Sequence, residues 1–314
     1  MNLPMNARPV RKYIYNSMMT DSRRWDGFKP RDGDIIISTP PKCGTTWTQM
    51  ICALLIFQKT RFERMLRDYS PWLDAPLKDV DEVLGALEAQ DHQRFIKTHT
   101  PLDGLPWFDN VIYLFVARDP RDAFVSLGNN MQNMTADVMQ KMAANARTRS
   151  VSLQPPKTDG QDAFREWMNP DGGDGKPADN GAAPEADILH HARTFWEFRD
   201  LPNVHLLHYA DMKANLETQM RRVAKAIGVT VDEAKWPELV AAAGFEAMKE
   251  NADALVPGPG HPDPWVDNAG FFNKGAHGQW EGVLGEKELA LYQKAMAARV
   301  PPDLARWLER GWNG

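Results

Sequence analysis

Short, continuous apolar runs alternate along this chain with longer stretches in which apolar residues recur every three or four positions. Four runs rich in Ile, Val, Leu and Phe have the length and composition of buried strands: residues 34–38, 94–99, 110–117 and 203–209. Helical spacing is found at residues 45–58, 119–131, 186–199 and 212–227. Strands that alternate with helices of this length predict an α/β fold with a central parallel sheet, flanked by helices on both faces.

The helix expected at 212–227 has the clearest pattern. Leu216, Met220 and Val223 share one helical face, and Gly228 follows as a C-terminal cap. The stretch TVDE at 230–233 then fits a capping box that opens another helix.

Two segments interrupt the alternation of strands and helices. Pro, Gly and Asp crowd out apolar residues at 151–185, which predicts a mobile surface insertion. A second long loop is expected at 255–270. Because the strands on both sides of the insertion fit one sheet, we expect a single domain over residues 1–314.

The composition is that of a soluble globular protein, with 43% hydrophobic and 25% charged residues. A net charge of −5 argues against general nucleic-acid binding. No signal-peptide pattern is visible, and the longest apolar run, ICALLIF, is too short to span a membrane. The two cysteines, Cys43 and Cys52, lie in one turn and helix where they cannot face each other, so we expect no disulfide and a reducing, cytoplasmic location.

A turn that could bind an anion follows the first strand, in TPPKCGTTW at residues 39–47. Gly44 can adopt backbone angles that let amides converge on an anion, and Lys42 adds a positive charge. Thr45 and Thr46 add hydroxyl donors at the start of a helix, whose dipole favours negative charge. The alternative is an ordinary strand-to-helix connection with a surface lysine.

Two common phosphate-binding loops do not fit this turn. A Walker A loop places its lysine after the second glycine, whereas Lys42 precedes Gly44. A C-x5-R phosphatase loop that starts at Cys43 would need arginine at position 49, which is Gln49. An ordinary Mg-ATP site is therefore disfavoured.

The turn resembles the 5′-phosphosulfate loop of the cytosolic and bacterial sulfotransferases, usually T-Y-P-K-S-G-T-T-W. These enzymes use 3′-phosphoadenosine 5′-phosphosulfate (PAPS) as co-substrate and release 3′-phosphoadenosine phosphate (PAP). Pro41 and Cys43 depart from the pattern. The resemblance implies that the loop holds the 5′-phosphate and stacks on adenine through six residues: Lys42, Cys43, Gly44, Thr45, Thr46 and Trp47.

Two further motifs extend the resemblance. RDPRDAFVS at 118–126 is similar to the family's 3′-phosphate motif and makes Arg118 and Ser126 candidate ligands of that phosphate. KTHTP at 97–101 resembles the segment that carries the family's catalytic histidine, which makes His99 the candidate base and Lys97 its neighbour at the reacting group. The alternatives are a capped helix start with local ion pairs and a structural histidine.

The adenine side and the 3′-phosphate loop lie further along the chain. HLLHYADMK at 205–213 resembles the family's L-x-Y-E-D-M-K segment, and GFEAM at 244–248 occupies the place of an adenine-side segment, although both sets of apolar residues could be core. FFNKGAHGQW at 271–280 resembles R-K-G-x-x-G-D-W, with asparagine in place of arginine. The nucleotide contacts implied here are Tyr209, Phe245, Met248, Asn273, Lys274 and Gly275.

The resemblance implies in-line transfer of a sulfuryl group from PAPS to an acceptor hydroxyl, without a metal. His99 would accept the hydroxyl proton, while Lys42 and Lys97 would stabilise charge. The acceptor stays open among a phenol, an aliphatic alcohol, a steroid and a glycolipid. Candidate acceptor contacts are aromatic or apolar residues in loops: Trp72, Leu73, Trp107, Phe108, Trp265 and others of the 255–270 loop.

Two rival interpretations are another P-loop-type enzyme, such as a small-molecule kinase, and a non-catalytic binder of PAP. SPWLD and KTHTPLDGL are most similar to bacterial members, including mycobacterial glycolipid sulfotransferases. The segment EGVLGEKELALYQ lacks the K-x-x-x-T-V dimer motif of many animal members, so the oligomeric state stays open.

Overall fold

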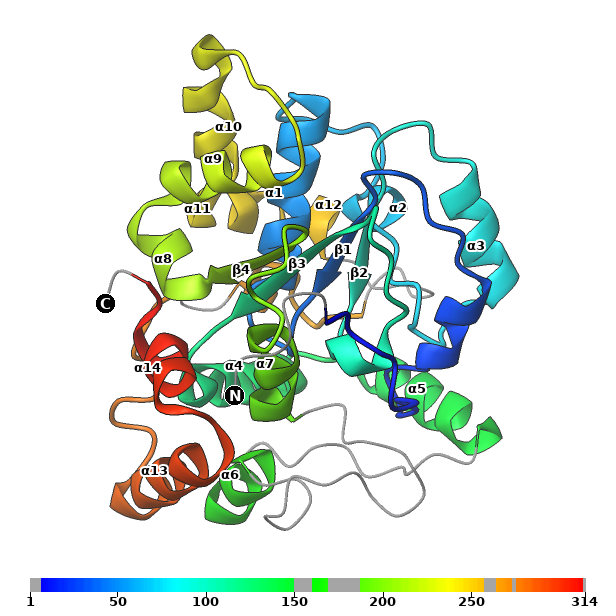
Figure 1. The fold of residues 1–314 in the computed structure, drawn as a ribbon. Helices are drawn as coiled ribbons and strands as arrows, with labels where there is room; N and C mark the ends of the chain where they lie inside the picture. The colour runs from blue at the N-terminus through cyan, green and yellow to red at the C-terminus, as the bar shows by residue number, and fades with distance from the viewer. Residues whose placement is uncertain (1–6, 150–159, 169–186, 257–263, 273–274, 313–314) are drawn as a thin grey trace.

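A central sheet of four parallel strands organises the computed structural model, which describes residues 7–149, 160–168, 187–256, 264–272 and 275–312 (Figure 1). The strands lie in the order β2-β1-β3-β4, so the first strand of the chain is central. Their bounds are Ile35–Ser38 (β1), Phe95–Thr98 (β2), Ile112–Ala117 (β3) and Val204–His208 (β4). Each strand lies within two residues of its predicted position.

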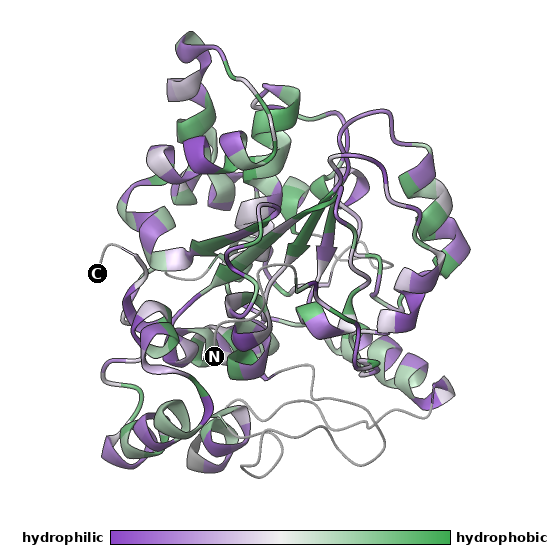
Figure 2. Ribbon diagram, in the orientation of Figure 1, coloured by the Kyte–Doolittle hydropathy of each residue, from purple (hydrophilic) through white to green (hydrophobic). Residues whose placement is uncertain are grey.

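Both faces of the sheet are buried. Alternate residues of each strand point to opposite faces, so each strand contributes to two hydrophobic clusters. Ile36 and Phe115 belong to one hydrophobic cluster, whereas Ile37 and Leu114 belong to another. Most of each strand is accordingly coloured hydrophobic in Figure 2. This explains why the strands are continuous apolar runs in the sequence.

Helices cover the two faces separately (Figure 1). One cluster includes residues of α1 (Thr45–Phe57), α2 (Leu66–Tyr69), α8 (Tyr209–Ala214), α9 (Leu216–Ala226), α10 (Trp236–Ala242), α11 (Phe245–Glu250) and α12 (Ala252–Leu255). The other includes residues of α3 (Val80–Glu88), α4 (Pro120–Gln132), α6 (Gly160–Met168), α7 (Ile188–Trp196), α13 (Glu286–Arg299) and α14 (Pro302–Arg310). A smaller cluster holds α5 (Ala136–Thr148). Short 3₁₀ turns lie at Ser22–Gly27, Leu102–Gly104, Glu233–Lys235 and Ala269–Phe271.

The helix predicted at 212–227 is two helices, α8 and α9. Asn215 separates the two helices, because its side chain accepts a hydrogen bond from the backbone N–H of Thr218 and caps the N-terminus of α9. The capping box predicted at 230–233 is also wrong. Asp232 is the cap, and it accepts the N–H of Ala234 at the start of the 3₁₀ turn.

Part of the predicted surface insertion belongs to the core. The α6 helix buries Phe164 and Trp167, and Trp167 donates to the carbonyl of Pro120 at 3.0 Å. Arg299 of α13 donates to the carbonyl of Met168 and pairs with buried Asp187. The prediction of a surface insertion is therefore wrong for residues 160–168. The rest of the predicted insertion, 151–159 and 169–185, lies outside the described residues.

The predicted α/β class, with a parallel sheet between two helical layers, is confirmed. None of the helices in the described ranges is both long enough and apolar enough to cross a membrane.

Candidate active site

A cleft of about 1910 Å³ opens where the parallel strands end. The turn after β1, the end of β2, Arg118 after β3 and the second half of α4 all contribute to its wall. Most predicted site residues line this cleft: Lys42, Gly44, Thr45, Thr46, Trp47, Lys97, His99, Arg118, Ser126, Tyr209, Phe245, Met248 and Gly275. The predicted Asn273 and Lys274 lie outside the described residues.

The turn before α1 has the backbone that an anion site requires. Lys42 and Gly44 both have positive φ, 65° and 103°, which is unusual for a lysine. A Cβ added at Gly44 would lie 3.2 Å from the ring of Tyr209, so the position needs glycine for both its angles and its space. The amides that follow open the N-terminus of α1, where backbone N–H groups lack helical partners.

Cys43 does not reach the cleft, although the resemblance implied that it binds the nucleotide. Its side chain is completely buried in the core, and its backbone N–H donates to the carbonyl of Pro40 at 3.3 Å. Burial raises the pKa of the thiol to about 12. The left-handed angles on either side of Cys43 turn its side chain inward, which the sequence pattern alone does not reveal.

Arg118 joins the two loops that border the nucleotide side of the cleft. Its guanidinium donates to the carbonyls of Lys42 at 3.1 Å and Ala276 at 3.0 Å. It also lies over the ring of Tyr209, 4.3 Å from the centroid. The Nε group is buried and has no partner within the described part of the chain. An anion in the cleft could accept a hydrogen bond from this remaining donor.

Asp122 is a site-building residue that the sequence reasoning missed. It is completely buried and accepts the backbone N–H groups of Gly278 at 2.9 Å and Trp280 at 3.3 Å. It thereby fixes the loop that carries Gly275, where an added Cβ would lie 2.3 Å from the ring of Phe245. Asp122 belongs to the RDPRD motif, but the two residues whose amides it binds are 156 and 158 positions away in the sequence.

The residues that were predicted to contact the adenine are packed together. Trp47 donates through its indole N–H to the carbonyl of Ala243 at 2.8 Å, and its ring meets Tyr209 edge-on at 5.3 Å. Both rings are mostly buried and leave an edge at the cleft. Asn130, one helical turn beyond Ser126 on α4, also lines the cleft and was missed; its amide nitrogen is buried without a partner in the described residues.

His99 is held in one tautomer. Its Nδ1 lies 2.7 Å from the carbonyl of Thr39, and because a carbonyl can only accept, Nδ1 carries the proton. The Nε2 atom is thereby left as the basic nitrogen. Burial, with smaller contributions from the charges of Lys97 and Lys42, lowers the pKa of His99 to about 3. The imidazole is therefore neutral at physiological pH.

Two lysines share the cleft with His99. Burial and the charges of Arg118 and Lys97 lower the pKa of Lys42 to about 7, and Lys42 lies 4.0 Å from the centroid of the Phe271 ring. Burial also lowers the pKa of Lys97 to about 8, partly opposed by the charge of Asp74. Buried lysines close to Arg118 favour a bound anion, which would offset the cost of burying their charge.

Part of the cleft wall is apolar. Trp72 and Trp265 line the cleft as predicted, and Lys78, Lys141 and Asn145 are among its polar lining residues. A methionine wall also lines it and consists of Met18, Met19, Met131, Met134 and Met142. Leu73, Trp107 and Phe108 were also predicted as acceptor contacts and do not line the cleft. Leu73 is buried in the core, Trp107 stacks on Tyr113, and Phe108 packs on Phe28.

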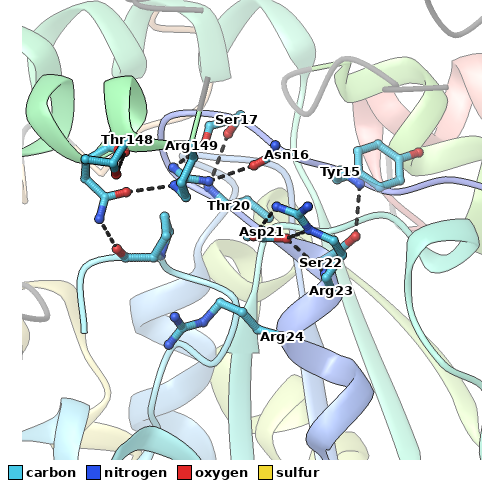
Figure 3. Close-up of polar contacts among 12 residues, drawn as sticks. Tyr15, Asn16, Ser17, Thr20, Asp21, Ser22, Arg23, Arg24, Thr148 and Arg149 are labelled. Atoms are coloured by element: carbon cyan, nitrogen blue, oxygen red, sulfur yellow. Dashed lines mark hydrogen bonds and ion pairs between the residues drawn. The ribbon is translucent and has the colours of Figure 1, made fainter. Parts of the chain in front are cut away.

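Polar contacts hold the N-terminal part of the methionine wall in place (Figure 3). Arg149, just after α5, donates to the side chain of Asn16 and to the carbonyl of Ser17, both at 2.7 Å. Tyr15 donates its backbone N–H to Ser22 at 2.9 Å. These contacts fix residues 15–22 against α5, and so place Met18 and Met19 opposite Met142.

Among the described residues, no group of His, Cys, Asp or Glu is arranged to hold a metal ion. The cleft combines an anion-binding turn, two lysines, a neutral imidazole and a partly apolar wall. Such a site suits an enzyme that transfers a charged group to an apolar acceptor.

Comparisons with known proteins identify the class more closely. A family model described as the sulfotransferase domain matches residues 32–303. Glycolipid sulfotransferases from Mycobacterium bovis and Mycobacterium tuberculosis are each 38% identical to this chain, with 96% of both chains covered. Sulfotransferase 1B1 of Canis lupus familiaris is 25% identical over 90% of this chain and 91% of its own. The chain therefore belongs to the sulfotransferase domain family.

Solved structures agree on the fold. A mouse sulfotransferase complexed with PAP superimposes with a TM-score of 0.66 at 19% identity, covering 91% of this chain and 92% of its own. A retinol dehydratase in complex with androsterone and PAP gives a TM-score of 0.65 at 20% identity, covering 90% and 87%. The predicted sulfotransferase class is thereby confirmed, and the solved structures confirm the predicted fold.

Proposed function

We propose that this enzyme transfers the sulfuryl group of PAPS to a hydroxyl of a large, mainly apolar acceptor of the lipid or glycolipid type, with His99 as general base. The observation that carries the proposal is the neutral His99, with Nε2 unprotonated, in one cleft with Lys42, Lys97 and the anion-binding turn. The sulfotransferases from Mycobacterium bovis and Mycobacterium tuberculosis, named for a glycolipid, support the acceptor class.

The residues of the cleft fit a nucleotide with a phosphate at each end. Lys42, the amides at 44–46 and the Thr45 and Thr46 hydroxyls would hold the 5′ end. The unpartnered Nε of Arg118 and Nδ2 of Asn130, with the nearby hydroxyl of Ser126, would hold the 3′-phosphate. Asn273 and Lys274, which precede Gly275 in the sequence and lie outside the described residues, are still proposed to bind the 3′-phosphate. Trp47, Tyr209, Phe245 and Met248 would contact the adenine.

When bound, PAPS supplies the activated sulfuryl group. Nε2 of His99 would take the proton of the acceptor hydroxyl, which typically contributes about 10²–10⁴-fold to the rate. Lys97 would lie beside the transferring group, and Lys42 would stabilise charge at the leaving phosphate oxygen. The charges of Lys42 and Lys97 lower the pKa of His99. The negative charge of a bound nucleotide would stabilise both ammonium groups and act on His99 in the opposite direction. It would therefore raise the pKa of the imidazole and make it a stronger base.

The methionine wall supports an apolar acceptor. Methionine is flexible and polarisable, and it adapts to irregular apolar ligands better than a rigid aromatic pocket does. The cleft volume of about 1910 Å³ exceeds the usual size of a small-molecule pocket, roughly 300–1,000 Å³, and leaves room for a second bulky molecule beside a nucleotide.

Transfer of a radiolabelled sulfuryl group from PAPS to an acceptor series tests this proposal. A long-chain glycolipid should be sulfated at least about tenfold more efficiently than its water-soluble sugar headgroup, because the wall buries apolar surface. Replacing Met131 and Met134 by glutamine should reduce this preference. Met139→Gln, on α5 but away from the cleft, is the matched control and should keep it.

The rivals give different results in a parallel thermal-shift measurement. PAP should raise the melting temperature and ATP with Mg²⁺ should not, because ligands stabilise the state they bind. Stabilisation by ATP with Mg²⁺ alone would favour a kinase. Stabilisation by PAP without transfer to any acceptor would favour a non-catalytic binder.

A further inference from the structure

Asp74 lies behind the catalytic strand end and binds both neighbours of His99. The hydroxyl of Thr100 donates to Oδ2 of Asp74 at 2.6 Å, and the hydroxyl of Thr98 donates to the same oxygen. The indole N–H of Trp25 adds a third bond at 3.0 Å. One buried carboxylate thus fixes the residues immediately before and after His99.

The Asp74 segment also contacts the catalytic candidates directly. Trp72 lies two residues before Asp74, and its ring meets the imidazole of His99 edge-on at 4.9 Å. Lys97 Nζ lies 4.2 Å from the centroid of the same ring. The backbone N–H of Lys97 donates to the carbonyl of Pro71 at 2.9 Å. A displacement of the Asp74 segment would therefore displace His99 and Lys97 together.

The carboxylate of Asp74 is more than a packing group. Its side chain is completely buried, and Oδ1 has no partner among the described residues, whereas Oδ2 accepts three bonds. Burying a carboxylate with one unpaired oxygen is costly, and a neutral side chain of the same size would avoid most of that cost. Its negative charge acts on Lys97 and favours the ammonium form.

We infer that Asp74 is a positioning residue for the transfer reaction: through Thr98 and Thr100 it fixes the orientation of His99, and through the Trp72 segment it holds Lys97 beside the imidazole. This inference rests on the proposed role of His99 as base. It concerns the rate of transfer rather than nucleotide binding, because Asp74 does not line the cleft.

Removal of the threonine hydroxyls tests the inference without touching the carboxylate. The double variant Thr98→Val with Thr100→Val should lower kcat at least about tenfold, as expected for a misplaced general base, while the Kd for PAP changes less than about threefold. Serine at both positions restores the hydroxyls and should return kcat to within about threefold of the wild type. Asp74→Asn should lower kcat in the same way.

A matched control separates positioning from general destabilisation. Asp34 is another buried carboxylate, paired with Arg94 just before β1 and β2, at the opposite edge of the sheet. Asp34→Asn should lower the melting temperature and leave kcat unchanged. An unchanged kcat in the valine variant, an equal loss in the serine variant, or an equal kcat loss in Asp34→Asn would each overturn the inference.

A second readout does not depend on turnover. Nitrogen NMR of ¹⁵N-histidine-labelled protein, assigned by comparison with His99→Gln, should show a single Nδ1-protonated tautomer for His99 in the wild type. The valine variant should show a mixture of tautomers, because a displaced imidazole loses the hydrogen bond that its Nδ1 donates to the carbonyl of Thr39. An unchanged tautomer in the valine variant would contradict the inference. A wild-type protein that transfers no sulfuryl group would refute only the proposed function, and the NMR readout would still test the inference.

Discussion

The depressed pKa of Lys42 makes nucleotide binding depend on pH in a way that can be calculated. In the free protein this pKa is about 7, because the ammonium group is buried near Arg118 and Lys97. A phosphate bound at Lys42 would raise the pKa well above that value. Binding above neutral pH should therefore take up a proton, and affinity should fall as the pH rises.

The magnitude follows from the free-state pKa alone. With a pKa of about 7, the charged fraction of Lys42 falls from about one half near pH 7 to about one hundredth near pH 9. The Kd for PAP should consequently rise about 50-fold, or ~2.3 kcal/mol, over this interval. Near pH 8, binding should take up about 0.9 proton.

Isothermal titration of PAP in two buffers with different ionisation enthalpies measures both quantities. Lys42→Arg is the matched variant: arginine stays charged throughout this range, so the variant should lose the share of the proton uptake that belongs to Lys42 and keep any share of Lys97. The reasoning is refuted if the variant and the wild type take up the same number of protons, or if wild-type affinity is constant between the two pH values.

Three further substitutions test the remaining parts of the structure. Arg118→Ala should raise the Kd for PAP about 10–100-fold in a binding titration, and much less for the nucleotide that lacks the 3′-phosphate; equal losses for both would reject the assignment. Asp122→Ala removes the acceptor of two loop amides and should also weaken PAP about tenfold or more by titration, whereas wild-type affinity would show that the 275–280 loop does not contribute. Phe164→Ala should lower the free energy of unfolding by about 3–5 kcal/mol in a urea titration, and a loss below about 1 kcal/mol would contradict the packing of α6.

The sheet and the main motifs could be predicted because their signals are local. Buried parallel strands are continuous apolar runs, and each motif residue follows directly after one of them. His99 and Arg118 line one cleft because the carboxyl ends of parallel strands lie at one edge. The order of the strands did not have to be known for this conclusion.

The missed features depend on distant or three-dimensional information. The amides bound by Asp122 are more than 150 positions away, and the hydroxyls bound by Asp74 are 24 and 26 positions away. The side chain of Cys43 points inward because of backbone angles that a motif does not show. In α6, Phe164 and Trp167 have helical spacing, but the Pro- and Gly-rich flanks obscured it.

The most direct test of the central claim is a paired measurement on His99→Ala, of single-turnover sulfuryl transfer and of PAP binding. Loss of the base should lower the transfer rate about 10²–10⁴-fold while the Kd for PAP stays within about threefold of the wild type. A collapse of PAP affinity, or a transfer rate equal to that of the wild type, would show that His99 is structural and would contradict the proposed mechanism.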